Sequence, residues 1–192
     1  MRTPNRYLLL FFFVTVFISL ALGKQVFASE HPKKFTVITT VAPITNMVRN
    51  IGGVYIDVIG VVPDGVDSHT FEPIPSDIKT LQAADLIIAN GLDLELPTLK
   101  LAEKVKKPAT RVVQLGNRTL KEEDWQYDFS FPREHGHPNP HLWLNIQLVM
   151  QYAEIIRDSL SELDPKHQEQ YFLNTETYLA KLTKLDQAIF AC

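Results

Sequence analysis

The sequence predicts an α/β fold: a parallel β-sheet flanked by helices and followed by one long helix. Short β-branched or apolar runs alternate with amphipathic segments, at the spacing of strand–helix–strand units. The run 85–89 (Asp-Leu-Ile-Ile-Ala) is almost wholly apolar, as in strands buried on both faces of a parallel sheet. After residue 146 the apolar residues recur only at helical spacing, so the chain is expected to end in helices.

The first elements follow from local signals. Residues 35–40 are rich in β-branched side chains and predict the first strand. Residues 43–51 predict a short helix, which the glycine pair 52–53 ends. The apolar run 54–62 predicts the second strand.

Two further helix–strand units complete the sheet. The sequence Pro-Ser-Asp at 75–77 is typical of a helix start, with Ser or Asp as N-cap. The third strand is predicted at 85–89 and ends at Asn-Gly 90–91. Pro97 begins another helix, and 110–115 predicts the fourth strand.

Residues 116–140 interrupt this alternation and predict a long loop. Loops of this length in a compact domain are either functional or disordered. The loop carries His135 and His137, which are candidates for auxiliary metal ligands. The alternative is that both are solvated polar residues, because two histidines in a mobile loop do not define a coordination geometry.

Two helices are predicted after the loop. The first covers 146–163, where apolar residues form a single stripe at helical spacing. Asp164-Pro165 predicts the N-cap and first residue of a second helix over 165–192. At the standard rise that helix is about 42 Å long, and we expect it to have little to pack against in a domain of this size.

The N-terminus predicts export. Residues 1–28 resemble a secretory signal peptide, with two arginines before an apolar core at 7–22. Val26 and Ala28 predict cleavage before Ser29, and Ala21 and Gly23 offer a second, weaker site before Lys24. The alternative to cleavage is an uncleaved membrane anchor. This segment lacks cysteine, so we expect a periplasmic protein that is not a lipoprotein.

Composition excludes some functions. With 19 basic and 22 acidic residues the net charge is −3, so there is no electrostatic footprint for a nucleic-acid partner. The only cysteine is Cys192, so no internal disulfide can form. Residues 29–164 are enough for a single α/β lobe.

Two histidines occupy loops at the ends of regular elements. His69 lies in the turn-rich segment 63–73, directly after the second predicted strand. His141 lies in Pro-Asn-Pro-His-Leu-Trp-Leu-Asn at 138–145, at the entry to the helix over 146–163. Either one alone reads as a polar loop residue. Together, as imidazole donors presented by a rigid scaffold behind an export signal, they predict metal capture.

These motifs carry a family resemblance. The segments 41–44, 67–73, 84–95 and 138–145 together resemble the zinc- and manganese-binding substrate-binding proteins of ABC importers, over essentially all of the chain after the signal. The resemblance implies two α/β lobes joined by a long helix, with the metal held between them. It also implies that His69 and His141 are the ligands from the first lobe, and that 165–192 begins the interlobe helix.

The resemblance implies a function as well. Such a protein captures a divalent ion, Zn²⁺ or Mn²⁺, in the periplasm and delivers it to the membrane permease of the importer. The family's remaining ligands come from the C-terminal lobe, which is absent here, and His167 lies in the wrong place to substitute. Two imidazoles leave the site incomplete. The chain is therefore either a fragment or a shortened product with compromised binding.

Two other classes of protein compete with this one. An exported surface or adhesin-like protein of the same fold would need no transport partner. A metallohydrolase would need a general base beside the metal, for which Glu72 is the only obvious candidate. The chain lacks the short motifs of known hydrolase sites, so we expect that it is not an enzyme.

Overall fold

The structure is a computed structural model that describes residues 33–190, with side chains to residue 189. The expected signal peptide at 1–28, its cleavage site before Ser29 and Cys192 lie outside the described residues. Within the described residues, no helix combines the length and the apolar character that crossing a membrane requires.

Four parallel strands form one sheet in the order β2-β1-β3-β4, which confirms the predicted fold class. Val37 on β1 lies opposite Val58 on β2 and Leu86 on β3, which sets the register. The strands are β1 (Phe35–Thr39), β2 (Ile56–Gly60), β3 (Leu86–Ala89) and β4 (Arg111–Gln114).

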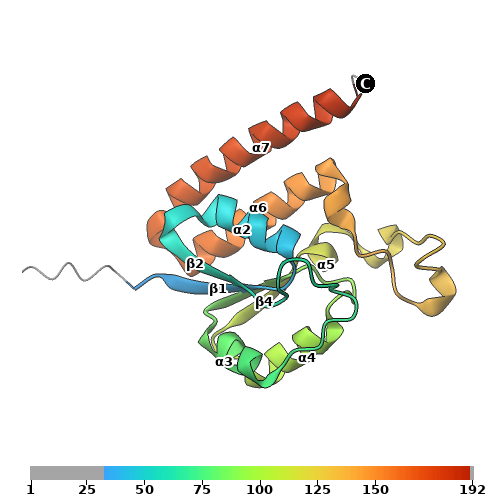
Figure 1. The fold of residues 1–192 in the computed structure, drawn as a ribbon. Helices are drawn as coiled ribbons and strands as arrows, with labels where there is room; N and C mark the ends of the chain where they lie inside the picture. Colours follow the sequence, from blue (N-terminus) through green and yellow to red (C-terminus); the bar gives the residue numbers. More distant parts are fainter. Residues whose placement is uncertain (1–32, 191–192) are drawn as a thin grey trace, which may run out of the picture. The chain divides into compact units, whose positions relative to one another are not determined.

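Helices cover both faces of the sheet (Figure 1). One face carries α2 (Ala42–Gly52), α6 (Ile146–Leu163) and α7 (Gln168–Phe190), which pack on one another. The other face carries α3 (Pro75–Ala83) and α4 (Leu96–Val105). The core is therefore split by the sheet. Successive residues of β1 belong to the two halves of the core. Val37 packs beneath α2 and α6, and Ile38 packs beneath α3.

Several predicted boundaries were wrong by a few residues. The expected strand at 54–62 begins later, because Gly53–Tyr55 forms a 3-10 turn. Gly53 has φ of 56°, a conformation that glycine adopts without strain and that ends α2. The expected strand at 110–115 ends at Gln114, and the short helix α5 (Leu115–Thr119) follows. The long loop is thus more structured than its sequence indicates.

The helix predicted over 165–192 begins differently. Pro165–His167 is a 3-10 turn, and α7 starts at Gln168. The carboxylate of Asp164 does not cap backbone N–H groups. Instead its Oδ2 accepts from His167 Nδ1 at 2.6 Å and from the Tyr171 hydroxyl at 2.8 Å.

The expectation that this helix has little to pack against was wrong for its first half. Tyr171 and Thr175 are fully buried, and the Asn174 side chain donates to the carbonyl of Ile51 at the end of α2. Toward its end α7 is more open, since Leu185 is 50% exposed and Ile189 is 57% exposed. The first turns of α7 therefore belong to the core of this lobe.

Asp164 gives a testable pH dependence. Burial raises the pKa of Asp164, but hydrogen bonds from His167 and Tyr171 outweigh it and leave that pKa below its ordinary value. An acid whose pKa is lower in the folded protein than in the unfolded chain stabilises the fold at pH values above its unfolded-state pKa. This stabilisation is lost as the pH falls through its folded-state pKa. Asp164→Asn is therefore expected to cost about 1–2 kcal/mol at neutral pH. Urea unfolding of both proteins should show the stability gap between them narrowing as pH falls below 3.8, the ordinary pKa of an aspartate. A gap that is constant with pH would contradict the assignment.

Candidate metal centre

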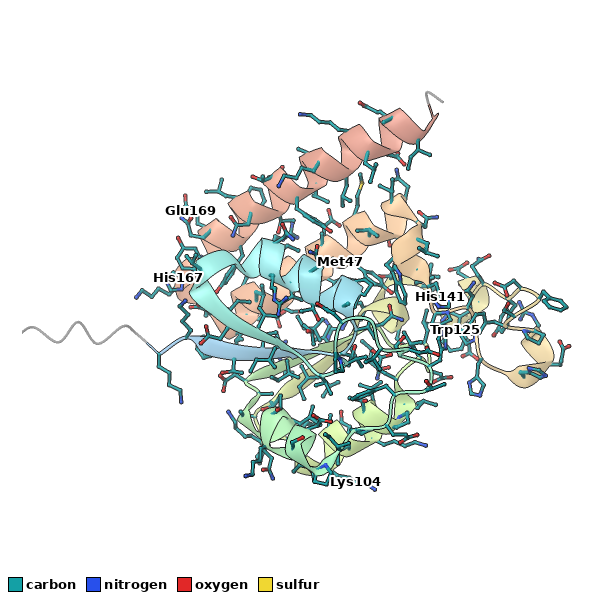
Figure 2. The ribbon with its side chains drawn as sticks, in the orientation of Figure 1. Met47, Lys104, Trp125, His141, His167 and Glu169 are labelled. Carbon is teal, nitrogen blue, oxygen red and sulfur yellow. The ribbon has the colours of Figure 1, made fainter. Side chains whose placement is uncertain are left out.

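The strand order places a topological switch point between β1 and β3. The chain leaves the carboxyl end of β1 toward β2 and leaves that of β3 toward β4, in opposite directions. Ligands of open α/β sheets bind at such a switch point, outside the carboxyl ends of the strands. Figure 2 shows His141 at this end of the sheet and His167 at the opposite end.

The structure brings His69 and His141 together although 72 residues separate them. Their Nε2 atoms lie 3.1 Å apart, and the ring centroids are 5.1 Å apart. If each nitrogen were about 2.0–2.1 Å from a zinc ion, this separation would give an angle of about 98° at the ion, near the tetrahedral value of about 109°. The pair therefore fits a shared metal ion with little movement. At this distance one Nε2 donates a hydrogen bond to the other.

His141 is held by the residue two positions before it. The Oδ1 atom of Asn139 accepts from the backbone N–H of His141 at 3.0 Å and lies 2.8 Å from its Nδ1. Burial lowers the pKa of His141, and the neighbouring His69 lowers it further, although Asp128 opposes this. A lowered pKa favours the neutral imidazole, which is the form that binds metals.

The loop that carries His69 is exposed and has its own turn. Asp67 Oδ1 accepts from the His69 backbone N–H at 2.9 Å, an arrangement in which an Asp side chain shapes its own turn. Two aromatic rings then surround the imidazoles. Phe131 lies 5.9 Å from His69 and 5.4 Å from His141 between ring centroids, and Trp143 meets His141 edge-on at 5.1 Å.

A buried carboxylate anchors the loop after β3. Glu95 is only 2% exposed and accepts from the Thr40 hydroxyl at 2.5 Å, from Asn90 N–H at 2.7 Å and from Gly91 N–H at 3.2 Å. Burial raises the pKa of Glu95, while these donors oppose the rise. Because Thr40 follows β1 and Asn90 follows β3, Glu95 joins the two strand ends at the switch point.

Asn90 extends this network to the loop that carries His141. Its Nδ2 donates to the carbonyl of Pro140 at 3.0 Å, and its Oδ1 accepts from the Tyr152 hydroxyl of α6 at 3.1 Å. The residue directly before His141 is thereby tied to the end of β3. The sequence showed Asn90 only as a strand terminator, and nothing local marks Glu95 as buried.

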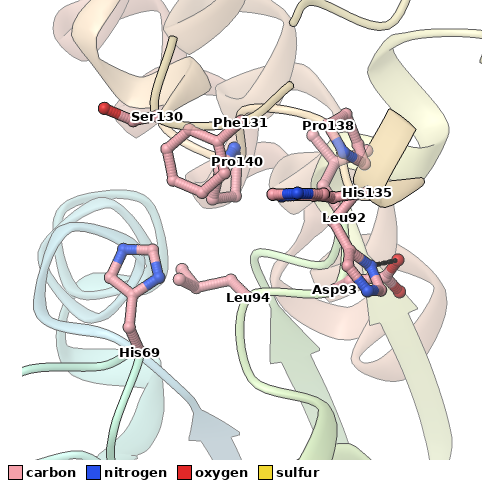
Figure 3. Close-up of a pocket in the computed structure, with 10 residues that line it drawn as sticks. His69, Leu92, Asp93, Leu94, Ser130, Phe131, His135, Pro138 and Pro140 are labelled. Carbon is pink, nitrogen blue, oxygen red and sulfur yellow. Dashed lines mark hydrogen bonds and ion pairs between the residues drawn. The ribbon is translucent and has the colours of Figure 1, made fainter. Parts of the chain in front are cut away.

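A pocket of about 270 Å³ opens beside His69 (Figure 3). His135 and His137 line it, and Figure 3 places His135 across the pocket from His69. His137 Nδ1 lies 2.9 Å from Asp93 Oδ2, where the backbone of Asp93 is left-handed with φ of 64°. The other lining residues are Leu92, Leu94, Ser130, Phe131, Pro138 and Pro140.

These side chains do not join the His69–His141 pair. Across residues 33–190, no group of three or more His, Cys, Asp or Glu side chains is arranged to hold a metal ion. Glu72 is exposed, and within the same residues it makes no hydrogen bond to either histidine of the pair. The described site therefore brings two imidazole ligands together, and Glu72 does not join them.

An α/β lobe that presents two imidazoles at its switch point is typical of a metal-binding domain. The chain belongs to the family described as zinc-uptake complex component A, periplasmic (ZnuA), whose model matches residues 37–191. That family consists of substrate-binding transport proteins rather than enzymes.

Individual relatives agree with this family. The chain is 34% identical to the manganese ABC transporter substrate-binding lipoprotein PsaA of Streptococcus mitis, over 97% of this chain and 60% of that protein. It is 35% identical to the iron-binding protein YfeA of Yersinia pestis, over 82% of this chain and 49% of that one. The chain thus spans about half to 60% of the length of these relatives. PsaA is described as a lipoprotein, so this comparison does not support the expectation that the chain lacks a lipid anchor.

Solved structures match the lobe in the same way. The Mn-bound periplasmic metal binding protein from Candidatus Liberibacter asiaticus has a TM-score of 0.67 and 30% identity, covering 77% of this chain and 53% of its own. Zn(II)-bound AdcA from Streptococcus pneumoniae has a TM-score of 0.68 over 81% of this chain and 32% of its own. Its identity is 24%, so this second likeness concerns the fold alone.

Proposed function

We propose that this chain is the metal-capturing lobe of a substrate-binding protein, which binds Zn²⁺ or Mn²⁺ and delivers it to the membrane permease of an ABC importer. The observation that carries the proposal is the 3.1 Å approach of the His69 and His141 Nε2 atoms at the switch point. Family membership and the metal-transport names of the relatives support it. The ion is cargo here, so no catalytic group is needed beside it.

Two imidazoles bind a divalent ion weakly, because zinc sites normally have four ligands. We propose that the remaining ligands come from the part of the relatives' length that this chain does not match. In that arrangement 29–164 is the first lobe and 165–192 is the start of the interlobe helix. Imidazole nitrogen suits zinc, and added carboxylates would favour manganese, so the missing ligands decide between the metals.

An auxiliary role is proposed for His135 and His137. Both line the pocket beside His69, and His137 already pairs with the Asp93 carboxylate. An ion that enters this pocket would meet these side chains on its way to the His69–His141 pair. Export through the N-terminal segment, with cleavage before Ser29, would place the lobe in the periplasm where such capture is useful.

Zinc titration of residues 29–192 tests the proposal. His69→Ala and His141→Ala are each expected to weaken zinc binding at least about tenfold, because either change leaves a single imidazole in the site. Isothermal calorimetry measures this, in a Cys192→Ser background that removes a competing thiol. His167→Ala is the matched control, since His167 lies at the other end of the lobe (Figure 2). If both site variants titrate like the parent, the proposed function is wrong.

A further inference from the structure

Three side chains form a hydrogen-bonded row that ends at the metal centre. Asp128 Oδ2 accepts from Asn139 Nδ2 at 2.5 Å, and Asn139 Oδ1 lies 2.8 Å from His141 Nδ1. The row joins the long loop to the histidine that precedes α6.

The carboxylate of Asp128 decides which way the Asn139 amide points. Its Oδ1 accepts from the backbone N–H groups of Ser130 and Phe131, at 2.8 and 3.0 Å. Its Oδ2 faces Asn139, and the hydrogen bond from Asn139 lowers the pKa of Asp128. An ionised carboxylate only accepts, so the NH₂ group of Asn139 must face it. The carbonyl oxygen of Asn139 is then left to face His141.

The backbone around Asn139 is held as firmly as its side chain. Pro138 and Pro140 are both buried and restrict the chain on either side of it. Asn139 N–H donates to the carbonyl of Gln126 at 2.8 Å, and the carbonyl of Pro140 accepts from Asn90. The amide of Asn139 therefore meets His141 in one fixed orientation.

This orientation determines which nitrogen of His141 carries the proton. A carbonyl oxygen 2.8 Å from Nδ1 accepts a hydrogen bond, so Nδ1 must be protonated. In a neutral imidazole the other nitrogen then has a free lone pair. For His141 that nitrogen is Nε2, which points at His69. His69 is consequently the donor in the hydrogen bond between the two Nε2 atoms.

We propose that Asn139, oriented by Asp128, is a positioning residue that keeps the His141 proton on Nδ1 and presents the Nε2 lone pair to the incoming ion. The proposal rests on the proposed function, because it treats His141 as a ligand. Hydrogen-bond partners of ligating histidines fix the tautomer and the ring orientation, and their loss typically costs 10–100-fold in metal affinity. The same range is expected for removal of Asn139.

The experiment compares residues 29–192 carrying Asn139→Leu with a swap variant, Asp128→Asn combined with Asn139→Asp. Leucine is close in size but accepts no hydrogen bond. In the swap, Asn at 128 donates to Asp at 139, whose second oxygen still accepts from His141, so the row is kept with the charge moved. Circular dichroism and thermal melting establish that each variant folds. Asp128→Ala, which removes only the orienting acceptor, is the further variant if Asn139→Leu does not fold.

The first readout needs no metal. Nitrogen-15 NMR at about pH 8, where imidazoles are neutral, is expected to show His141 protonated on Nδ1 in the parent and in the swap variant. Asn139→Leu or Asp128→Ala should shift it toward the Nε2-protonated tautomer. Parent protein with the proton on Nε2, or a tautomer that is unchanged in Asn139→Leu, overturns the proposal. A merely structural role of Asn139 would not move this signal.

The second readout is zinc affinity by calorimetry. Asn139→Leu is expected to bind 10–100-fold more weakly than the parent, and the swap variant is expected to restore affinity to within about threefold of it. A swap variant as weak as Asn139→Leu would overturn the proposal. The two readouts also separate this proposal from the proposed function. If the parent protein has the expected tautomers but binds no zinc, only the proposed function fails. If the parent binds zinc through both histidines but lacks the expected tautomers, only the positioning role of Asn139 fails.

Discussion

Replacing Glu95 with alanine is expected to lower the free energy of unfolding by about 3–5 kcal/mol. The change removes the acceptor of three buried hydrogen-bond donors: the Thr40 hydroxyl and the N–H groups of Asn90 and Gly91. Each buried donor left without a partner costs about 1–3 kcal/mol. Glu95 is almost fully buried, so bulk solvent does not reach these donors in the parent protein.

Glu95→Gln is the matched control, since it keeps the volume and one acceptor oxygen. Its expected cost is about 1–2 kcal/mol, because its NH₂ group faces one donor. Burial raises the pKa of Glu95 in the folded protein above its ordinary value of 4.5. Ionisation of Glu95 therefore lowers the free energy of unfolding as the pH rises from 4.5 through the folded-state pKa. The control lacks this pH dependence. Urea unfolding of the three proteins at several pH values measures both effects. An alanine variant no less stable than the glutamine variant would contradict the anchoring role.

Replacing Tyr171 with alanine is expected to cost about 3–5 kcal/mol, the range for large aromatic side chains in cores. Its side chain is fully buried, and its ring meets Tyr55 edge-on at a centroid distance of 6.3 Å. Its hydroxyl also donates to Asp164. Tyr171→Phe keeps the ring and loses only that hydrogen bond, so about 1 kcal/mol is expected for it.

A chain that ends at Leu163 extends the same prediction. It loses Tyr171 together with every other contact of α7, so it should unfold at lower urea concentration than Tyr171→Ala. Far-UV circular dichroism during urea titration follows both proteins. A truncated chain as stable as the full one would show that α7 contributes nothing to the lobe. The original expectation of a helix with little to pack against would then be correct.

The parallel sheet could be predicted because its signals are local. The run at 85–89 is apolar along both faces, and β3 is buried at every position. Glycine at 52–53 ended the first helix as predicted, since Gly53 takes a positive φ that other residues avoid. The register between strands was not predictable in the same way. It depends on which residues of β1 face β2 and β3, and no short segment contains that information.

The residues of the candidate site also differ in how far they could be predicted from local sequence. His69 and His141 are predicted as ligands from their own loops and from the family resemblance, and the structure places their Nε2 atoms 3.1 Å apart. Glu95 and Asn139 were not selected, although both carry hydrogen bonds that shape the site. Glu95 acts on Thr40, 55 residues away, and Asn139 takes its orientation from Asp128 in an irregular loop. Asn90, which binds Pro140 across 50 residues, was missed for the same reason.

The sequence by itself determined the fold class and the order of the strands along the chain, and it predicted the two candidate histidines, because each of these depends on residue patterns over short segments. Only the tertiary structure decided which buried acid joins β1 to β3, which amide fixes His141, and how far α7 packs on its own lobe. The physical reason is that a buried polar group must find its hydrogen-bond partner wherever the folded chain supplies one. Those partners lie far away in sequence, so their choice depends on how the strands, helices and long loop meet in space.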